Sequence, residues 1–378
     1  MKTKSIAASA AAALILSLAA CGGSDTGTGD DSIKIGIALD LSGQWEPYGK
    51  SAEKGALAAI EKVNRDGGVL GQDVETITED LASVPENGPL AVRKLASNGV
   101  AAILGPTTST ALVLTAPAAK QSETLILAYG SADAFADGVL NKWTFRLAPT
   151  GPTEQPKFLK SLQEKISYKT VGVFYDPANK VSVGESEVIK KEASALGYKV
   201  VVNEAVPGGQ TQFSGVVSKF AAADPDLIWV SNAAAESAAF MKGIRARGLD
   251  GVFAGGPTFQ NAEMRELAGE VAEGGYSFGP YFPTSDRPAS KEFVALFQEL
   301  NDGEVPDVLA AEAYDGMTAI LKAIEQANET GTAAVRDALA KLSFDGVIGT
   351  ITWDGGPDNT TPSTEIVQIR DGQFVPGA

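Results

Sequence analysis

IKIGIALDLSGQWEPYGKSAEKGALAAIEKVNRDGGVLG, residues 33–71, is the stretch that decides the fold class. Residues 33–40 form an apolar run with alternating isoleucines, which is typical of a buried strand. Apolar residues then recur at positions 52, 56, 59, 60 and 63, the spacing of one face of a helix. A strand that leads into an amphipathic helix is half of a β-α-β unit, so the stretch predicts a parallel sheet covered by helices.

The same alternation of strand-like and helix-like segments continues along the chain. Short β-rich runs are separated by apolar stripes at helical spacing, including one that ends at Gly197 and later ones within residues 292–300 and 311–326. Over this length the pattern favours two α/β units rather than one. The predicted strands are residues 33–40, 74–80, 101–104, 124–127, 171–175, 200–203, 227–230 and 252–254.

Two clusters of glycine and proline mark where the chain is expected to cross between the units. Pro149, Gly151 and Pro152 precede a new strand and helix series, and residues 274–283, GGYSFGPYFP, precede further helical patterns. If the chain crosses at both clusters, the first unit is assembled from two separated pieces.

Composition excludes several classes of function. The chain has 378 residues with 47 acids, 31 bases and a formal charge of -16, so a nucleic acid is not an expected partner. With no histidine and one cysteine, it cannot build a Ser-His-Asp or Cys-His site, a histidine-rich zinc site or an internal disulfide. We therefore expect no metal and no cofactor.

The N-terminus has the features of an export signal. Lys2 and Lys4 precede an apolar run, residues 6–20, that is too short to span a membrane. The sequence LAACG that ends at Gly22 resembles a bacterial lipobox, which implies that residues 1–20 are removed and that Cys21 receives a lipid. Residues 21–32 would then be a flexible tether to the outer face of the cytoplasmic membrane. The alternative is an ordinary signal peptide that is cut elsewhere and leaves a free thiol.

Candidate binding residues follow the predicted strands, because open parallel sheets bind ligands at the carboxyl ends of their strands. In the first half these loops are residues 41–49, 105–110 and 128–133. Ser109 or Thr110 could cap the following helix and, with adjacent backbone N–H groups, hold a carboxylate. In the second half the corresponding loops contain Asp176, Ala233 with Glu236, and Pro257.

These segments, in this order, resemble the type I periplasmic solute-binding proteins, and specifically the branched-chain amino-acid receptor family of ATP-driven importers. The resemblance covers nearly all of residues 33–370. Its marks are the stretch 35–71, ILGPTTS at 103–109, FRLAP at 145–149, PDLIWVSNAAAESAAFMKGIRARGL at 225–249 and AYDGMTAI at 313–320.

The resemblance implies an α/β fold of two Rossmann-like lobes joined by a hinge of three crossings. The first lobe would consist of residues 33–148 and 281–365, and the second of residues 149–280 and 366–378. The last strand is expected to return to the second lobe near Ile366.

The resemblance also implies roles for single residues. Ser109 matches the serine that receives the amino-acid carboxylate, and Gly130 matches a residue whose backbone binds the ligand backbone. Trp45 and Tyr48 lie in the loop that packs on the ligand side chain. In the mechanism we expect, Thr110 binds the solute together with Ser109 and the N–H groups around Gly130.

Other positions depart from the family pattern. Ala132 stands where leucine-type members place a threonine hydroxyl, with Ser131 or Asp133 as possible substitutes. Residues 180–183 and Ala233 stand where those members use tyrosines from the second lobe.

The acid that faces the ammonium group is also missing from its family position, which Pro257 occupies. A proline cannot accept an ion pair. A free amino acid as ligand therefore requires Asp133, Asp176 or Glu236 to replace that acid.

Simpler roles remain open for some of these residues. Ser109 could be only a helix cap, Trp45 and Tyr48 could cover the edge of a lobe, and Glu236 could be a solvated acid in the first turn of a helix.

The prediction for the whole chain is a substrate-binding lipoprotein of an ABC importer. It would bind an amino acid or a related small carboxylate or amide between two closing lobes and pass it to a permease with separate ATPase subunits. The alternatives are the ligand-sensing subunit of a signalling receptor and a hydrolase based on two carboxylates.

Overall fold

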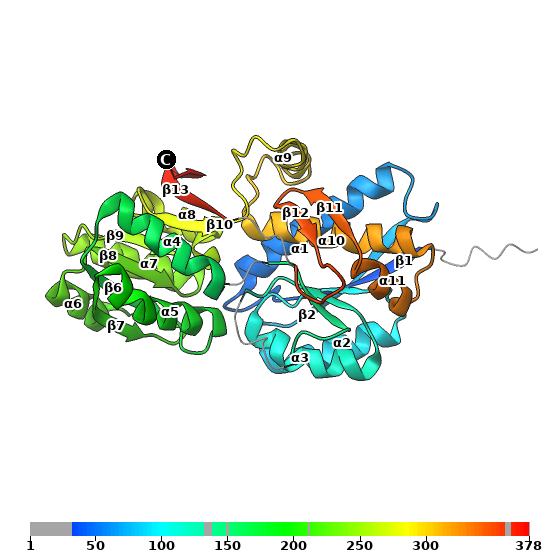
Figure 1. Cartoon of the computed structure of the whole chain (residues 1–378), viewed down its shortest axis with the longest axis horizontal. Coiled ribbons are helices and arrows are strands. Elements are labelled where there is room, and N and C mark those ends of the chain that lie inside the picture. Colours follow the sequence, from blue (N-terminus) through cyan, green and yellow to red (C-terminus); the bar gives the residue numbers. More distant parts are fainter. Residues whose placement is uncertain (1–31, 132–137, 149–150, 211, 360–363, 378) are drawn as a thin grey trace, which may run out of the picture. The chain divides into compact units, whose positions relative to one another are not determined.

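The computed structural model describes residues 32–131, 138–148, 151–210, 212–359 and 364–377 (Figure 1). The chain from Ser32 onward forms one compact unit. The predicted signal peptide and Cys21 lie outside the described residues, as do Ala132 and Asp133.

The first sheet has five parallel strands in the order β2-β1-β3-β4-β5. Its two faces are covered by different helices, because alternate residues of a strand point to opposite sides. Ile35 and Ile37 of β1 pack with the core formed by α1, α9, α10 and α11, whereas Ala38 packs with α2 and α3. We call this sheet and its helices the first lobe. Its strands are β1 Ile33–Leu39, β2 Val74–Asp80, β3 Ile103–Leu104, β4 Ile126–Ala128 and β5 Thr144–Arg146; its helices are α1 Glu46–Arg65, α2 Gly88–Ser97, α3 Ser109–Ser122, α9 Pro288–Leu300, α10 Val308–Ala327 and α11 Thr332–Leu339.

The second sheet has seven strands in the order β14-β13-β10-β9-β8-β6-β7. The strands from β7 to β10 are parallel, and β13 and β14 are added antiparallel at one edge. Helices α4 and α5 cover one face, and α6, α7 and α8 cover the other. We call this assembly the second lobe. Its strands are β6 Thr170–Tyr175, β7 Lys199–Ala205, β8 Leu227–Ser231, β9 Val252–Gly255, β10 Tyr276–Gly279, β13 Glu365–Arg370 and β14 Gln373–Pro376; its helices are α4 Gly151–Ile166, α5 Lys180–Leu196, α6 Ser214–Ala223, α7 Ala234–Ala246 and α8 Ala262–Ala268.

The chain passes between the sheets three times. It leaves the first sheet after β5, returns after β10, and leaves again between the hairpin β11 Ser343–Gly346 and β12 Gly349–Thr352 and strand β13. Figure 1 shows β13, in red, among the yellow and green elements of the second lobe. Ile366 of β13 pairs with Phe278 of β10. The residue numbers at which one lobe ends and the other begins remain a prediction.

All eight predicted strands are present, with ends that differ by at most two residues from the prediction. Strand β10 lies inside the glycine and proline cluster at residues 274–283, for which only a crossing between the units was predicted. The short strand β5 was not predicted either. Both are buried strands of three or four residues, too short for a periodicity to be recognised.

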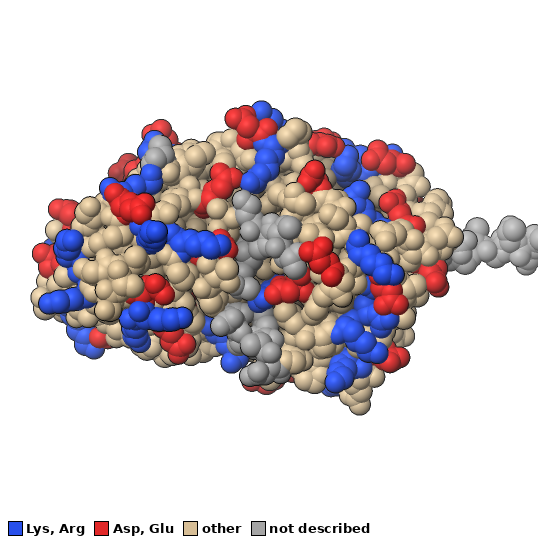
Figure 2. All heavy atoms as spheres, viewed as in Figure 1, with Lys and Arg blue, Asp and Glu red and all other residues tan. Residues whose placement is uncertain are grey.

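Charges of both signs are interspersed on the face drawn in Figure 2, rather than gathered into one patch. Among the described residues, no helix is both long enough and apolar enough to cross a membrane.

Candidate ligand site

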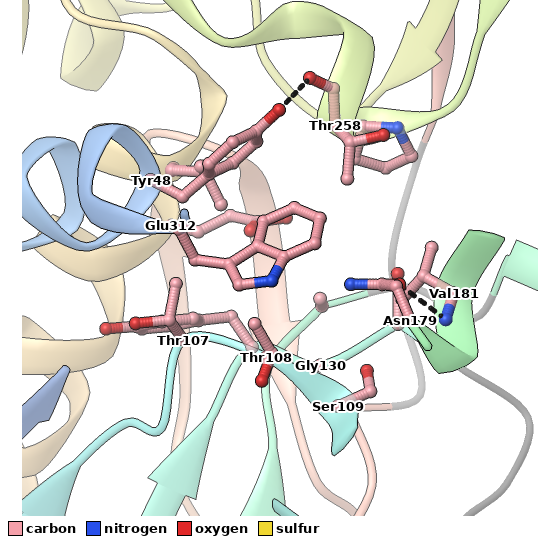
Figure 3. A pocket seen from close by; sticks show the side chains of 15 residues that line it. Tyr48, Thr107, Thr108, Ser109, Gly130, Asn179, Val181, Thr258 and Glu312 are labelled. Carbon is pink, nitrogen blue, oxygen red and sulfur yellow. Dashed lines mark hydrogen bonds between the residues drawn. The ribbon is translucent and has the colours of Figure 1, made fainter. Parts of the chain in front are cut away.

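A pocket with about 590 Å³ of atom-free space, part of it open to solvent, is lined by residues of both lobes (Figure 3). Its walls come from the loops after β1, β3, β4, β5, β6 and β9 and from helices α1, α3, α5 and α10. Of the predicted site residues, six line it. The described residues that line it are Trp45, Tyr48, Thr107, Thr108, Ser109, Tyr129, Gly130, Ser131, Ala148, Asn179, Val181, Pro257, Thr258, Leu309 and Glu312.

Trp45 and Tyr48 form a buried aromatic pair at the start of α1. Their ring centroids lie 5.1 Å apart in an edge-on arrangement, and both rings pack in a core cluster of the second lobe. The Tyr48 hydroxyl donates to the Thr258 carbonyl at 3.2 Å (Figure 3). Burial, with the negative charge of Asp307 nearby, raises the pKa of Tyr48, so the hydroxyl stays protonated. The pair therefore lines the pocket, and Tyr48 links the two lobes. The alternative that these rings only cover the edge of a lobe does not account for these contacts.

The N-terminus of α3 meets the pocket at Ser109. Thr108 is the N-cap, because its backbone is extended and its hydroxyl accepts the Ala111 N–H at 3.2 Å. The prediction that Ser109 or Thr110 caps this helix is therefore wrong by one or two residues. Ser109 is the first helical residue and is 1% exposed. A helix N-terminus favours an anion, since its first N–H groups have no helical partner.

The second lobe presents Asn179 and Thr258 to the pocket. The side-chain oxygen of Asn179 caps α5 by accepting the N–H groups of Val181 and Ser182, at 2.9 and 3.1 Å. Figure 3 shows the amide nitrogen of Asn179 directed into the pocket. The Thr258 hydroxyl is buried without a hydrogen-bond partner in the described part of the chain. It can therefore bind a solute that enters.

Tyr129, which follows β4, carries a second buried hydroxyl without a hydrogen-bond partner among the described residues. Its ring is 4% exposed. Gly130 and Ser131 follow it along the pocket wall.

Thr110 and Asp176 lie outside this pocket. The Thr110 hydroxyl donates to the Ala178 carbonyl at 3.4 Å and accepts the Lys180 N–H at 3.2 Å, so it joins α3 to the start of α5. Asp176 accepts the side-chain amide of Gln44 at 3.4 Å, and burial raises its pKa. Both residues line a neighbouring small cavity.

Ala233 and Glu236 also lie outside the pocket. Ala233 is the N-cap of α7 and packs in a core cluster of the second lobe. Glu236 is 6% exposed and accepts the Gly209 N–H at 2.6 Å. The alternative that Glu236 is a solvated acid is therefore wrong, because its carboxylate holds a neighbouring loop.

Sequence reasoning missed Glu312, which lines the pocket from α10. It is 3% exposed. Burial, reinforced by the negative charges of Asp307 and Asp315, raises its pKa to about 8. A glutamate within the apolar run VLAAEA, residues 308–313, was the available signal, but the quoted motif began one residue later. Val181 lies within residues 180–183, the range at which the family pattern places a site residue. The other lining residues that were not singled out are Thr107, Thr108, Tyr129, Ala148, Asn179, Thr258 and Leu309.

Among the described residues that line the pocket there is no lysine and no arginine. An anion in it would be bound by N–H and hydroxyl groups rather than by a cationic side chain. That arrangement suits a single carboxylate and offers little to a highly charged phosphate ester.

The sequence profile of the periplasmic binding protein family matches residues 32–373. The chain belongs to this family. Its members are solute-binding proteins that are exported and work with ABC transporter components.

This periplasmic binding protein is similar to several known proteins. It is 28% identical over 327 residues to the leucine-, isoleucine-, valine-, threonine- and alanine-binding protein of Pseudomonas aeruginosa, with 86% of each chain covered. The branched-chain amino acid transporter substrate-binding protein of Streptococcus pneumoniae, in complex with isoleucine, superimposes with a TM-score of 0.83 at 23% identity, covering 91% of this chain and 97% of that one. A solute-binding protein of R. palustris in complex with benzoate superimposes with a TM-score of 0.81 at 17% identity, covering 92% of this chain and 96% of that one. The two-lobed α/β fold is thereby confirmed as that of the type I periplasmic binding proteins.

Proposed function

We propose that this protein binds a small solute that bears a carboxylate, an amino acid or a related compound, and delivers it unchanged to a membrane permease driven by separate ATPase subunits. One observation carries the proposal: a single pocket between the lobes combines the N-terminus of α3, an aromatic pair, and the Tyr129 and Thr258 hydroxyls, which have no partner among the described residues. The solute carboxylate would lie at Ser109 and the N–H groups around Gly130. Its apolar part would contact Trp45 and Tyr48.

Closure of the lobes would trap the solute. The hydrogen bond from Tyr48 to Thr258 joins the first lobe to the second directly beside the pocket. When the lobes close, water leaves the pocket, and the polar contacts to the solute strengthen in the less polar surroundings. A permease would then recognise the closed arrangement of the two lobes.

The relatives support a carboxylate as the common feature of the solute. The Pseudomonas protein is named for five amino acids, the Streptococcus structure holds isoleucine, and the R. palustris structure holds benzoate. All of these compounds carry one carboxylate. We further propose that Cys21 is lipidated and holds the protein at the outer face of the cytoplasmic membrane; mass spectrometry of the protein isolated from membranes would detect the added diacylglycerol.

The test is a binding screen with residues 22–378, which contain the compact unit. Thermal shift and calorimetry would be run with leucine, isoleucine, valine, threonine, alanine, benzoate and 4-hydroxybenzoate. A true ligand at a hundred times its dissociation constant adds about 2.7 kcal/mol to the free energy of unfolding. Absence of binding across this panel would contradict the proposal. Conversion of a bound compound into a product would instead favour the hydrolase.

Ser109→Ala tests the position of the carboxylate. We expect the variant to lose about 1 to 2 kcal/mol of binding free energy, the scale of one hydrogen bond to a charged group. Calorimetry that returns the wild-type affinity would remove Ser109 from the site.

A further inference from the structure

The pocket has one acidic side chain among the described residues that line it, and that side chain is Glu312. The acid of the family pattern is replaced by Pro257. Two of its possible substitutes, Asp176 and Glu236, lie outside the pocket, and the third, Asp133, lies outside the described residues.

Glu312 differs from the two acids that precede and follow it, Asp307 at the N-cap of α10 and Asp315 within the helix. Asp307 accepts hydrogen bonds from Ser51 and from the N–H groups of Leu309 and Ala310, both at 3.0 Å. Asp315 accepts the N–H groups of Val347 and Ile348, at 3.0 and 2.8 Å. These two carboxylates fix local structure. Glu312 has no hydrogen bond to any described residue, although its side chain is almost completely buried.

The Glu312 oxygens are absent from the fully buried side-chain atoms without a partner, so they reach the space of the pocket. A ligand that enters can supply the donors that the described residues do not. Glu312 and Ser109 both line the pocket, and Figure 3 labels them at different places on its wall. An α-amino acid carries its two charges close together, negative and positive. The pocket offers the N-terminus of α3 for one charge and Glu312 for the other.

We propose that Glu312 binds the ammonium group of an α-amino acid and so takes the role that Pro257 cannot fill. The inference rests on the proposed function and narrows its substrate class from small carboxylates to amino acids. A carboxylic acid without an amine offers no cation to Glu312, so it should bind more weakly than the matching amino acid.

Binding should then be linked to a proton. The pKa of Glu312 is raised to about 8 by burial and by Asp307 and Asp315, so the empty pocket holds mostly the neutral acid at pH 7. The ammonium group would ionise it, and the proton would be released. Tyr129 faces Glu312 from the loop after β4, while Asp40 and Glu53 act on Tyr129 from the end of β1 and from α1. All of these neighbours are acidic or neutral, so none replaces the solute as a cation.

The experiment compares Glu312→Gln with Glu325→Gln in calorimetric titrations at pH 7. Glu325 is an exposed residue of the same helix, so the control removes the same charge away from the pocket. The probes are pairs that differ by the amine: leucine with 4-methylpentanoate, phenylalanine with 3-phenylpropanoate, and alanine with propanoate. The amino acids of the binding screen and benzoate complete the set.

We expect wild type and Glu325→Gln to bind an amino acid and not its amine-free partner. Glu312→Gln should bind that amino acid at least about 30-fold more weakly, as expected when one partner of a buried charge pair is removed. In wild type, the affinity should rise by about tenfold or more between pH 6 and pH 8, with release of up to one proton at pH 7. This proton linkage needs no variant, so it tests the inference even if Glu312→Gln fails to fold.

Three results would overturn the inference. If Glu312→Gln keeps the amino-acid affinity within about threefold, or if wild type shows no proton release, the role of Glu312 falls while the proposed function stands. If wild type prefers benzoate or an amine-free acid, the substrate class is wrong but a carboxylate-binding function remains. If no amino acid or carboxylate binds, the proposed function itself falls.

Discussion

Two buried tyrosine hydroxyls without hydrogen-bond partners in the described chain allow ligand binding to be separated from stability. Tyr129 lines the pocket, whereas Tyr281 packs in the core cluster of the first lobe. Tyr129→Phe should leave the free energy of unfolding unchanged or raise it by about 1 kcal/mol, because a desolvated hydroxyl is removed. Its affinity for the solute should fall by about five- to tenfold, the scale of one neutral hydrogen bond. Denaturant unfolding and calorimetry measure the two quantities.

Tyr281→Phe is the matched control at this scale. It removes the same group from the same kind of surroundings, so its effect on stability should be similar while its affinity for the solute stays at the wild-type value. Equal affinities for both variants would exclude the Tyr129 hydroxyl from the site.

At the scale of elements, the close contact of α1 and α10 positions the pocket. A Cβ atom at Gly55 of α1 would lie 2.0 Å from the Ala310 carbonyl oxygen of α10, so the two backbones could not keep their distance. We expect Gly55→Ala to lower the free energy of unfolding by about 1 to 3 kcal/mol. It should also weaken solute binding, because α10 carries Leu309 and Glu312. Thermal unfolding and calorimetry test this.

The control for this prediction is Gly184→Ala in α5, where an added Cβ meets nothing within 4 Å. That variant should gain up to about 1 kcal/mol, since alanine favours helices over glycine. If Gly55→Ala were as stable as Gly184→Ala, the helices would not be in this close contact.

The elements were more predictable from the sequence than the site was. Strand and helix periodicities are local, and all the strands that carry pocket loops except β5 were found from them. The cap of α3 was displaced because Thr107, Thr108 and Ser109 all carry hydroxyls, and only the backbone angles of Thr108 decide which one caps. Glu312 was missed because α10 reaches β3 and β4 from almost two hundred residues away in the chain. A pattern within a short stretch of sequence does not reveal a contact between residues so far apart in the chain.

At the scale of the whole molecule, buried acids make stability depend on pH. Burial raises the pKa of Glu185 and of Asp315 to about 7, and that of Asp40 to about 6. Between pH 5 and pH 8 the folded chain therefore binds more protons than the unfolded chain, and the free energy of unfolding should fall as the pH rises. For Glu185 alone the shift corresponds to about 3 kcal/mol. Melting temperatures across this range measure the effect.

Glu185→Gln should flatten part of that decline. The Glu185 carboxylate accepts the Trp229 indole N–H at 3.0 Å, and its second oxygen has no partner among the described residues. The control is Glu187→Gln, an exposed change on the same helix, which should keep the wild-type profile. A profile that rises from pH 5 to pH 8 would show that these acids are ionised in the folded protein.

The division of the first lobe into two stretches of chain also orders its assembly during synthesis. Strands β6 to β10 are contiguous in the chain and can pair as soon as they emerge, whereas the core on one face of β1 lacks α10 until nearly the whole polypeptide has been made. Synthesis of the first lobe thus begins first, but its core is completed only when the late helices have been made. During export, its apolar strand β1 would stay without its final neighbours until the C-terminal part has crossed the membrane, and chaperones have that interval in which to act.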